Sequence, residues 1–225
     1  MAASLLSVST PAAGPGDDSV TLNYPGMQFN QVLVAIVMVD AGVGNTVDFY
    51  NPTSVDGWQT IANTATGVRR GVMALWRAVT GTEGSTTTVY ATTSGFAGNV
   101  GGCIAVFSGA HPVAGVYAAG TAGITNGTAA SPADVTTTTN DELAVAAFAY
   151  ANLGTISAIS ANSWVEANAE VNDGTWSYDW QTLVVPTATT ITGGSATLGT
   201  SGNHGIVTFA LKSFIPLAQW GRGLS

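Results

Sequence analysis

Charged side chains are scarce in this chain of 225 residues, and their scarcity excludes several classes of protein. Only 8% of the residues are charged, against about 25% in a typical soluble protein, so the surface must rely on Thr, Ser, Asn and Gly. The net charge is −8 and no run of Lys or Arg occurs, which argues against nucleic-acid binding. Lys212 is the single lysine, which is more typical of a surface exposed to proteases or packed against other subunits.

Cysteine and long apolar runs are also scarce. Cys103 is the only cysteine, so no internal disulfide is available, and its apolar surroundings indicate a small buried hydrophobe rather than a nucleophile. No apolar run reaches the roughly 20 residues that a transmembrane helix needs, so we expect no membrane span. The first ten residues contain no Lys or Arg and no sustained apolar core, which predicts no secretory signal and favours assembly in a host cytoplasm.

Two apolar segments organise the rest of the chain. Val32 to Val39 and Leu143 to Tyr150 are each eight residues long, carry no charge and are flanked by turn-forming residues. Such segments are typical of strands buried on both faces. The Val-Ala pair at positions 34 and 35 returns at positions 145 and 146, which is the first sign of an internal repeat.

Further echoes follow in the same order around both segments. Ser19-Val-Thr precedes the first as Asp134-Val-Thr precedes the second, and Gly57-Trp58 and Ser163-Trp164 follow them. No helical periodicity occurs, and candidate strands recur every 8 to 15 residues. The sequence therefore predicts an all-β fold: an antiparallel β-sandwich, similar to a jelly roll, built from two pseudo-repeats.

The predicted organisation has three parts. Residues 1–18 form an arm or a peripheral strand, residues 19–212 form the sandwich, and residues 213–225 form a tail. Within the sandwich we expect a first repeat at 19–109, a connector at 110–133 and a second repeat at 134–212. The loop from Thr80 to Ser85 has hairpin length and glycine content, which predicts that the strands on either side of it are antiparallel neighbours.

Residues suited to catalysis are few. His111 and His204 are the only histidines and both lie in turn-like sequence, and no metal-binding spacing of His or Cys occurs. A hydrolase would need one of them beside a carboxylate, and no Gly-x-Ser-x-Gly motif is present. Glu166 and Glu170 would lie about 13 Å apart on a strand, too far for a glycosidase pair. We therefore predict no catalytic residue, no cofactor and no metal.

Calcium is the one ion that the carboxylates leave open. Asp17 and Asp18, or Asp40 and Asp48 across a loop, are its candidate ligands. Their spacing matches no EF-hand loop, so solvated acidic turns are the favoured interpretation.

Three aromatic residues form the best candidate binding surface. Trp176, Tyr178 and Trp180 alternate, so on a strand they project from one face. An exposed ladder of this kind suits flat sugar rings, whereas a sandwich core needs the same pattern facing inward. The core interpretation is favoured, and the glycan platform is the alternative.

Several segments resemble a duplicated β-sandwich family that occurs in bacteriophage structural proteins and bacterial surface proteins. The likeness runs from about Ser19 to Lys212, through Pro25-Gly-Met-Gln, Ala74-Leu-Trp-Arg-Ala-Val-Thr80, Gly102-Cys-Ile-Ala-Val-Phe-Ser-Gly109 and Val135-Thr-Thr-Thr. The surface proteins normally carry a signal peptide, so its predicted lack here favours the phage branch. The resemblance implies a virion role and supplies no catalytic residues.

The expected function is therefore that of a non-enzymatic virion protein. We expect a capsid decoration, or cement, subunit on the capsid surface that binds phage coat protein or other virion subunits. Decoration subunits often lie on symmetry axes, so a homo-oligomer, a trimer by analogy, is expected. The tail supplies the candidate partner contacts, which are Phe214, Ile215, Leu217 and Trp220. The alternative function is a carbohydrate-binding adhesin or a tail-fibre receptor-binding module.

Overall fold

All regular structure in the described part of the protein is β-strand, as the sequence predicts. The computed structural model describes residues 3–15, 19–42, 46–49, 57–64, 69–93, 98–112, 116–151, 155–160, 162–166, 171–172 and 176–214. The strands up to residue 108 are β1 (Ser4–Val8), β2 (Ala12–Pro15), β3 (Ser19–Asn23), β4 (Val32–Asp40), β5 (Val47–Phe49), β6 (Gln59–Asn63), β7 (Arg70–Ala78), β8 (Thr86–Thr93) and β9 (Asn99–Ser108). Those that follow are β10 (Val116–Ala130), β11 (Val135–Thr136), β12 (Glu142–Ala151), β13 (Val165–Glu166), β14 (Val171–Asn172), β15 (Trp176–Val185), β16 (Thr190–Ile191) and β17 (Ala196–Leu211).

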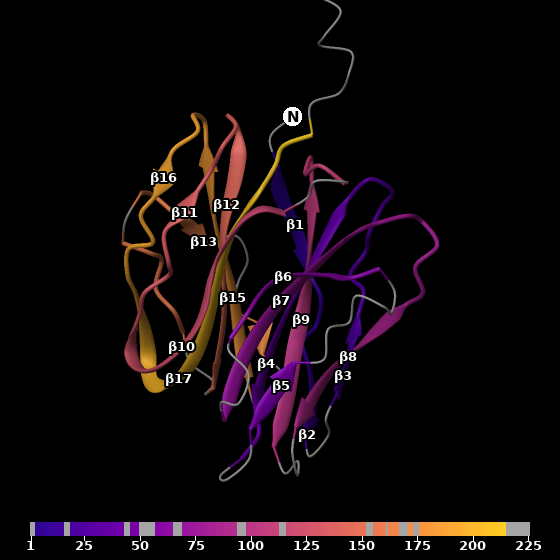
Figure 1. Cartoon of the computed structure of the whole chain (residues 1–225), viewed down its shortest axis with the longest axis vertical. Coiled ribbons are helices and arrows are strands. Elements are labelled where there is room, and N and C mark those ends of the chain that lie inside the picture. Colours follow the sequence, from indigo (N-terminus) through magenta and orange to yellow (C-terminus); the bar gives the residue numbers. More distant parts are fainter. Residues whose placement is uncertain are drawn as a thin grey trace, which may run out of the picture.

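The two halves of the chain build large sheets with the same strand order. The first large sheet runs β1-β9-β4-β7-β6, with β2 also on β9, and the second runs β10-β17-β12-β15-β13, with β14 also on β15. All pairings within both sheets are antiparallel. Figure 1 shows the first half on the right, in indigo to magenta, and the second on the left, in orange to yellow. The predicted sandwich of two pseudo-repeats is confirmed.

The strand registers extend this equivalence to single residues. Val34 lies opposite Trp76 and Ala105, and its counterpart Val145 lies opposite Thr182 and Phe209. The turns before β4 and β12 match too, because each contains a residue with positive φ, Asn30 at 67° and Asp141 at 62°.

Three apolar cores divide the molecule into layers. The central core lies between the large sheets, where β4 packs against β12 and β7 against β17. A second core lies between the first large sheet and the small sheet β3-β8-β5, and a third covers the outer face of the second large sheet with β11, β16 and neighbouring loops. Both faces of each organising strand are therefore buried, which explains why these segments are apolar throughout.

The two large sheets contact each other through both apolar and polar side chains. The rings of Phe107 and Trp180 meet edge to face with centroids 6.1 Å apart. A Cβ on Gly205 would lie 2.6 Å from Cβ of Val72, so the missing side chain lets β17 approach β7. Near this crossing Arg70 Nη1 donates to Asn203 Oδ1 at 3.1 Å.

Three predictions about the segments need correction or refinement. The predicted connector contains β10, which pairs with β17 from Val116 to Ala130. Its Gly, Ala and Thr content hides the apolar alternation that marks a strand, and the pairing with β17 decides its structure. The predicted arm contains β1 and β2 on the edge of the first large sheet, which fits the peripheral-strand alternative. The expected pairing of β7 with β8 is wrong, because β8 crosses to the small sheet and pairs with β3 and β5.

Candidate functional site

The two ends of the described chain meet at one corner of the molecule, which we call the terminal corner. The Ala3 N–H donates to Ser213 Oγ at 3.3 Å, and Ser213 Oγ in turn donates to the Asp141 carbonyl. Ser213 also forms an isolated bridge with Ala110. Figure 1 shows the yellow end of β17 rising beside the indigo β1. Segments at opposite ends of the described chain therefore contribute to one surface.

Phe214 is the only predicted partner-contact residue within the described part of the chain. Its N–H donates to the Gly109 carbonyl at 2.6 Å, and its ring packs edge to face on His111 with centroids 5.8 Å apart. The Phe214 side chain is 39% exposed, and Leu6 on β1 is 50% exposed. Ile215, Leu217 and Trp220 lie outside the described residues. The terminal corner thus presents apolar side chains from both ends of the described chain.

The aromatic ladder is buried. Trp176, Tyr178 and Trp180 project from β15 into the central core and are 2%, 0% and 1% exposed. A glycan platform needs exposed rings, so these three residues do not form one. Because the three residues alternate along β15, they project from the same face of the strand, and the first large sheet covers that face.

Both histidines make packing or hydrogen-bond contacts within the fold. His111 packs on Phe214, and His204 is fully buried, with its ring hydrogen-bonded to Thr125 Oγ1 and at 3.3 Å to the Gly202 carbonyl. Burial lowers the pKa of His204 below its usual value, although hydrogen bonds to Gly202 and Ala129 act in the opposite direction. Among the described residues, no group of three or more His, Cys, Asp or Glu side chains is placed to hold a metal ion.

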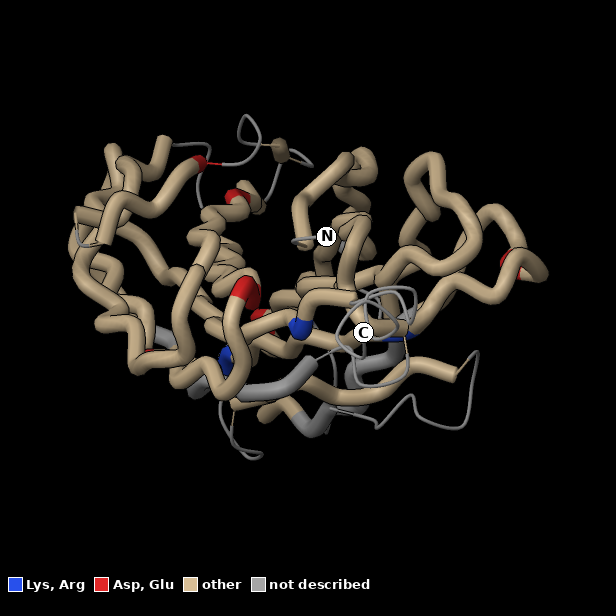
Figure 2. The backbone as a smooth tube through the Cα atoms, turned by 90° about the horizontal axis from the view of Figure 1, so that it is seen from above, with Lys and Arg blue, Asp and Glu red and all other residues tan. Residues whose placement is uncertain are grey.

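The carboxylate candidates for calcium have other roles or lie outside the described residues. Asp40 binds Arg69 Nε at 3.0 Å and Arg70 Nε at 2.7 Å, and it accepts the Gly42 N–H at 3.0 Å. Partial burial alone raises the pKa of Asp40, but these three donors outweigh it and lower the pKa. A carboxylate neutralised by two arginines is a poor calcium ligand. The described Lys, Arg, Asp and Glu residues are distributed over several parts of the fold (Figure 2).

The Asp48 side chain, Asp17, Asp18 and Glu170 lie outside the described part of the structure. The calcium alternative at those positions stays a prediction, as does the distance between Glu170 and its predicted companion Glu166 on β13.

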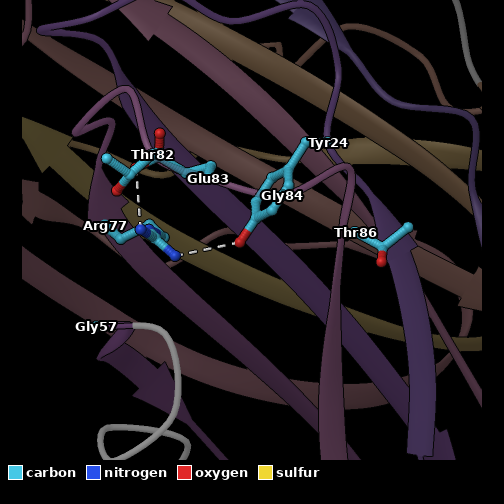
Figure 3. A pocket seen from close by; sticks show the side chains of 7 residues that line it. All are labelled: Tyr24, Gly57, Arg77, Thr82, Glu83, Gly84 and Thr86. Carbon is cyan, nitrogen blue, oxygen red and sulfur yellow. Dashed lines mark hydrogen bonds and ion pairs between the residues drawn. The ribbon is translucent and has the colours of Figure 1, made fainter.

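A polar pocket that the sequence did not indicate lies beside the loop between β7 and β8 (Figure 3). Its volume is about 440 Å³, and it is lined by Tyr24, Gly57, Arg77, Thr82, Glu83, Gly84 and Thr86. We call it the Arg77 pocket. Its members come from four separate segments of the first half, so no local motif announces it. The one available signal was an arginine inside an apolar strand of a chain with only five basic residues.

Aromatic rings and a carboxylate hold Arg77 in place. The guanidinium carbon lies 6.0 Å from the Tyr24 ring centroid and 5.9 Å from that of Trp58, within the range of cation–π attraction. Tyr24 and Trp58 stack with centroids 6.4 Å apart. Nη1 of Arg77 donates to Tyr24 Oη at 3.2 Å, and Nη2 pairs with Glu83 Oε1 at 3.0 Å.

Glu83 ties the loop to this cluster. Its Oε1 accepts hydrogen bonds from the Thr80 N–H at 2.6 Å and Thr80 Oγ1 at 2.7 Å, and its Oε2 accepts the Gly81 N–H at 2.8 Å. Burial alone would raise the pKa of Glu83, but the donors on Thr80 and Gly81 lower it to about 2. Glu83 is therefore ionised at neutral pH and balances the charge of Arg77.

No helix among the described residues is long and apolar enough to cross a membrane. No protein-family model matches the chain, and neither a curated protein nor a solved structure matches it. The resemblance to the phage and surface-protein family therefore stays a prediction that rests on the residues quoted above.

Proposed function

We propose that the protein is a non-enzymatic bacteriophage virion subunit that decorates the capsid and binds coat protein and copies of itself. The proposal is supported most directly by the terminal corner. There, the arm and the tail meet through Ala3 and Ser213, and Leu6 and Phe214, each close to them in the sequence, are partly exposed, as expected for the contact surface of a building block.

The layered cores restrict where partners can bind. The described central parts of β4 and β12 are buried on both faces, so the large sheets offer their edges and ends rather than their faces. Leu6 lies on the edge strand β1, and that strand carries no charged residue and no proline. Such an edge is suited to association with another chain.

Virion localisation and coat-protein binding rest on the sequence resemblance and the composition. A surface with few charged residues and many threonines suits dense packing among subunits. A trimer is the expected oligomer, by analogy with decoration subunits on symmetry axes.

The oligomeric state of the full chain tests this proposal. Light scattering coupled to size-exclusion chromatography is expected to show a small oligomer, which Leu6→Asp and Phe214→Asp convert to monomer. Val165→Asp is the matched control, because Val165 is 61% exposed and lies on β13, which β12 and β15 separate from β17.

Binding to particles tests the virion role. Purified protein is expected to co-sediment with capsids that lack their decoration subunit, and mass spectrometry of intact particles is expected to detect the chain. A wild-type monomer that binds no capsid and is missing from particles would contradict the proposal.

A further inference from the structure

The Arg77 pocket exists because the first repeat departs from the second at one loop. Seven residues connect β7 to β8, whereas four connect the equivalent strands β15 and β16. The longer loop contains Thr82, Glu83 and Gly84, which form one wall of the pocket (Figure 3). Loops that vary between otherwise equivalent units are frequent sites of binding.

The second repeat has no counterpart of the central arginine. By register, Leu183 takes the place of Arg77, because Trp76 pairs with Val34 and Thr182 pairs with the equivalent Val145. Leu183 packs on the third apolar core. A leucine therefore satisfies the fold at this position, and the arginine adds a feature that folding alone does not require.

The chemistry of the wall favours an uncharged ligand. The Glu83 side chain is 1% exposed and its oxygens accept hydrogen bonds from Thr80, Gly81 and Arg77, so it neutralises Arg77 rather than facing a ligand. The whole chain carries a net charge of −8, which repels anions. Neither an anion nor a cation finds an unbalanced charge in this wall.

The other polar side chains of the lining carry hydroxyl groups, on Tyr24, Thr82 and Thr86. Tyr24 Oη accepts from Arg77 Nη1, and Thr82 Oγ1 bonds to Thr80 Oγ1, so each of these two hydroxyls has further hydrogen-bonding capacity. The Tyr24 ring is stacked on Trp58. Hydroxyls both donate and accept, as sugar hydroxyls do. The volume of about 440 Å³ lies within the range of small-ligand sites.

We propose that the Arg77 pocket binds a neutral sugar residue through Tyr24, Arg77, Thr82 and Thr86. This proposal does not rest on the virion role, since it involves none of the residues of the terminal corner. It also differs from the alternative of a glycan platform on β15, whose rings are buried.

Titration of the full-length ¹⁵N-labelled protein with methyl glycosides of glucose, galactose and mannose tests the site. At least one glycoside is expected to shift the amide signals of Thr82, Gly84 and Thr86 saturably, with a Kd in the millimolar range. Inorganic phosphate and glycerol serve as probes of non-specific binding and are expected to shift none of these signals.

Two variants and a matched control separate binding from folding. Thr86→Val and Tyr24→Phe each remove one hydroxyl and are expected to weaken glycoside binding at least tenfold. Thr190→Val removes a hydroxyl from β16, the second repeat's counterpart of β8, and is expected to leave binding unchanged. Amide spectra without sugar show whether each variant keeps the fold.

Three outcomes would overturn the proposal. They are no shift with any of the three glycosides, equal shifts with phosphate or glycerol, and unchanged glycoside affinity in both folded pocket variants. Oligomerisation is measured separately, so failure here leaves the proposed virion role untouched.

Discussion

The two halves of the chain share an architecture and differ in where they place charge. Register-equivalent strands build both large sheets, and apolar residues fill equivalent positions in both. All three ion pairs among the described residues lie in the first half, at Asp40 with Arg69 and Arg70 and at Arg77 with Glu83. The comparison separates residues that the repeated fold needs from residues that only one copy has.

The tryptophans of the repeat illustrate both sides of the comparison. Trp58 and Trp164 each precede the strand that pairs with β7 or β15, and both are buried. Only Trp58 has Tyr24 stacked on it, and its Nε1 donates to Thr87 Oγ1 at 3.2 Å. The shared tryptophan belongs to the fold, and the added partner Tyr24 lines the Arg77 pocket.

Breaking the central core should have the largest effect. Trp180→Ala removes a ring that contacts Phe107 across the two large sheets, and we expect it to lower the free energy of unfolding by about 3–5 kcal/mol. Urea denaturation measures this loss. A loss below about 1 kcal/mol would mean that the sheets do not depend on each other for stability.

Removing the charge of Glu83 should have a smaller effect, confined to the first repeat. Glu83→Gln weakens four hydrogen bonds and leaves Arg77 unbalanced, so we expect a loss of about 2 kcal/mol at neutral pH. The folded-state pKa of about 2 lies below the ordinary 4.5. The stabilisation is therefore complete above pH 4.5 and is lost as the pH falls towards 2.

Thermal unfolding as a function of pH measures this dependence. The difference between wild type and Glu83→Gln should shrink as the solution is acidified through that range. A difference that stays constant from pH 6 to pH 2 would show that the Glu83 charge does not stabilise the loop.

His204 tests a polar position of the second repeat. Val100 is its register counterpart, because Val39 pairs with Val100 and the equivalent Tyr150 pairs with His204. Burial lowers the pKa of His204, so the unfolded chain binds a proton at a higher pH than the folded one. Stability should therefore fall as the pH drops below the ordinary value of about 6.5.

His204→Val should reduce this slope, because valine does not titrate and the first repeat already accommodates it at the matching place. Differential scanning calorimetry between pH 7 and pH 5 compares the two proteins. Identical slopes would rule out His204 as their origin.

The smallest effect on stability is expected at a position where the two repeats have chemically similar residues. Gln31 immediately precedes β4, and its counterpart Glu142 is the first residue of β12. Each side chain accepts the N–H three residues earlier, at Gln28 and Thr139 respectively. Glu142→Gln installs the residue of the first repeat, and we expect a change below about 1 kcal/mol by chemical denaturation. A larger loss would show that the charge of Glu142 has a role that the first repeat lacks.

The sequence was most informative where one residue type decided a whole element. Uncharged apolar segments identified β4 and β12, because only a strand buried on both faces tolerates such a run. It was less informative where pairing decides the structure. The Gly-rich and Thr-rich β10 has no apolar pattern of its own and is held by β17.

The candidate sites also differ in whether local sequence or tertiary packing determines them. Alternation placed Trp176, Tyr178 and Trp180 on one face, but only the packing of the first large sheet shows that this face is buried. The Arg77 pocket was missed because its members are separated along the chain, and Tyr24 and Arg77 are brought together on the Trp58 ring. The terminal corner could not be predicted from local sequence patterns, because it is formed by the contact between Ala3 and Ser213, which are far apart in the sequence.

Native-state hydrogen exchange across increasing denaturant tests most directly whether the two repeats form one unit through their shared core. The amides at the centres of β4 and β12 should exchange with the same free energy of opening, and Trp180→Ala should lower both by the same amount. If β4 stayed protected at denaturant concentrations where β12 had already exchanged, the two repeats would be independent domains, contrary to this account.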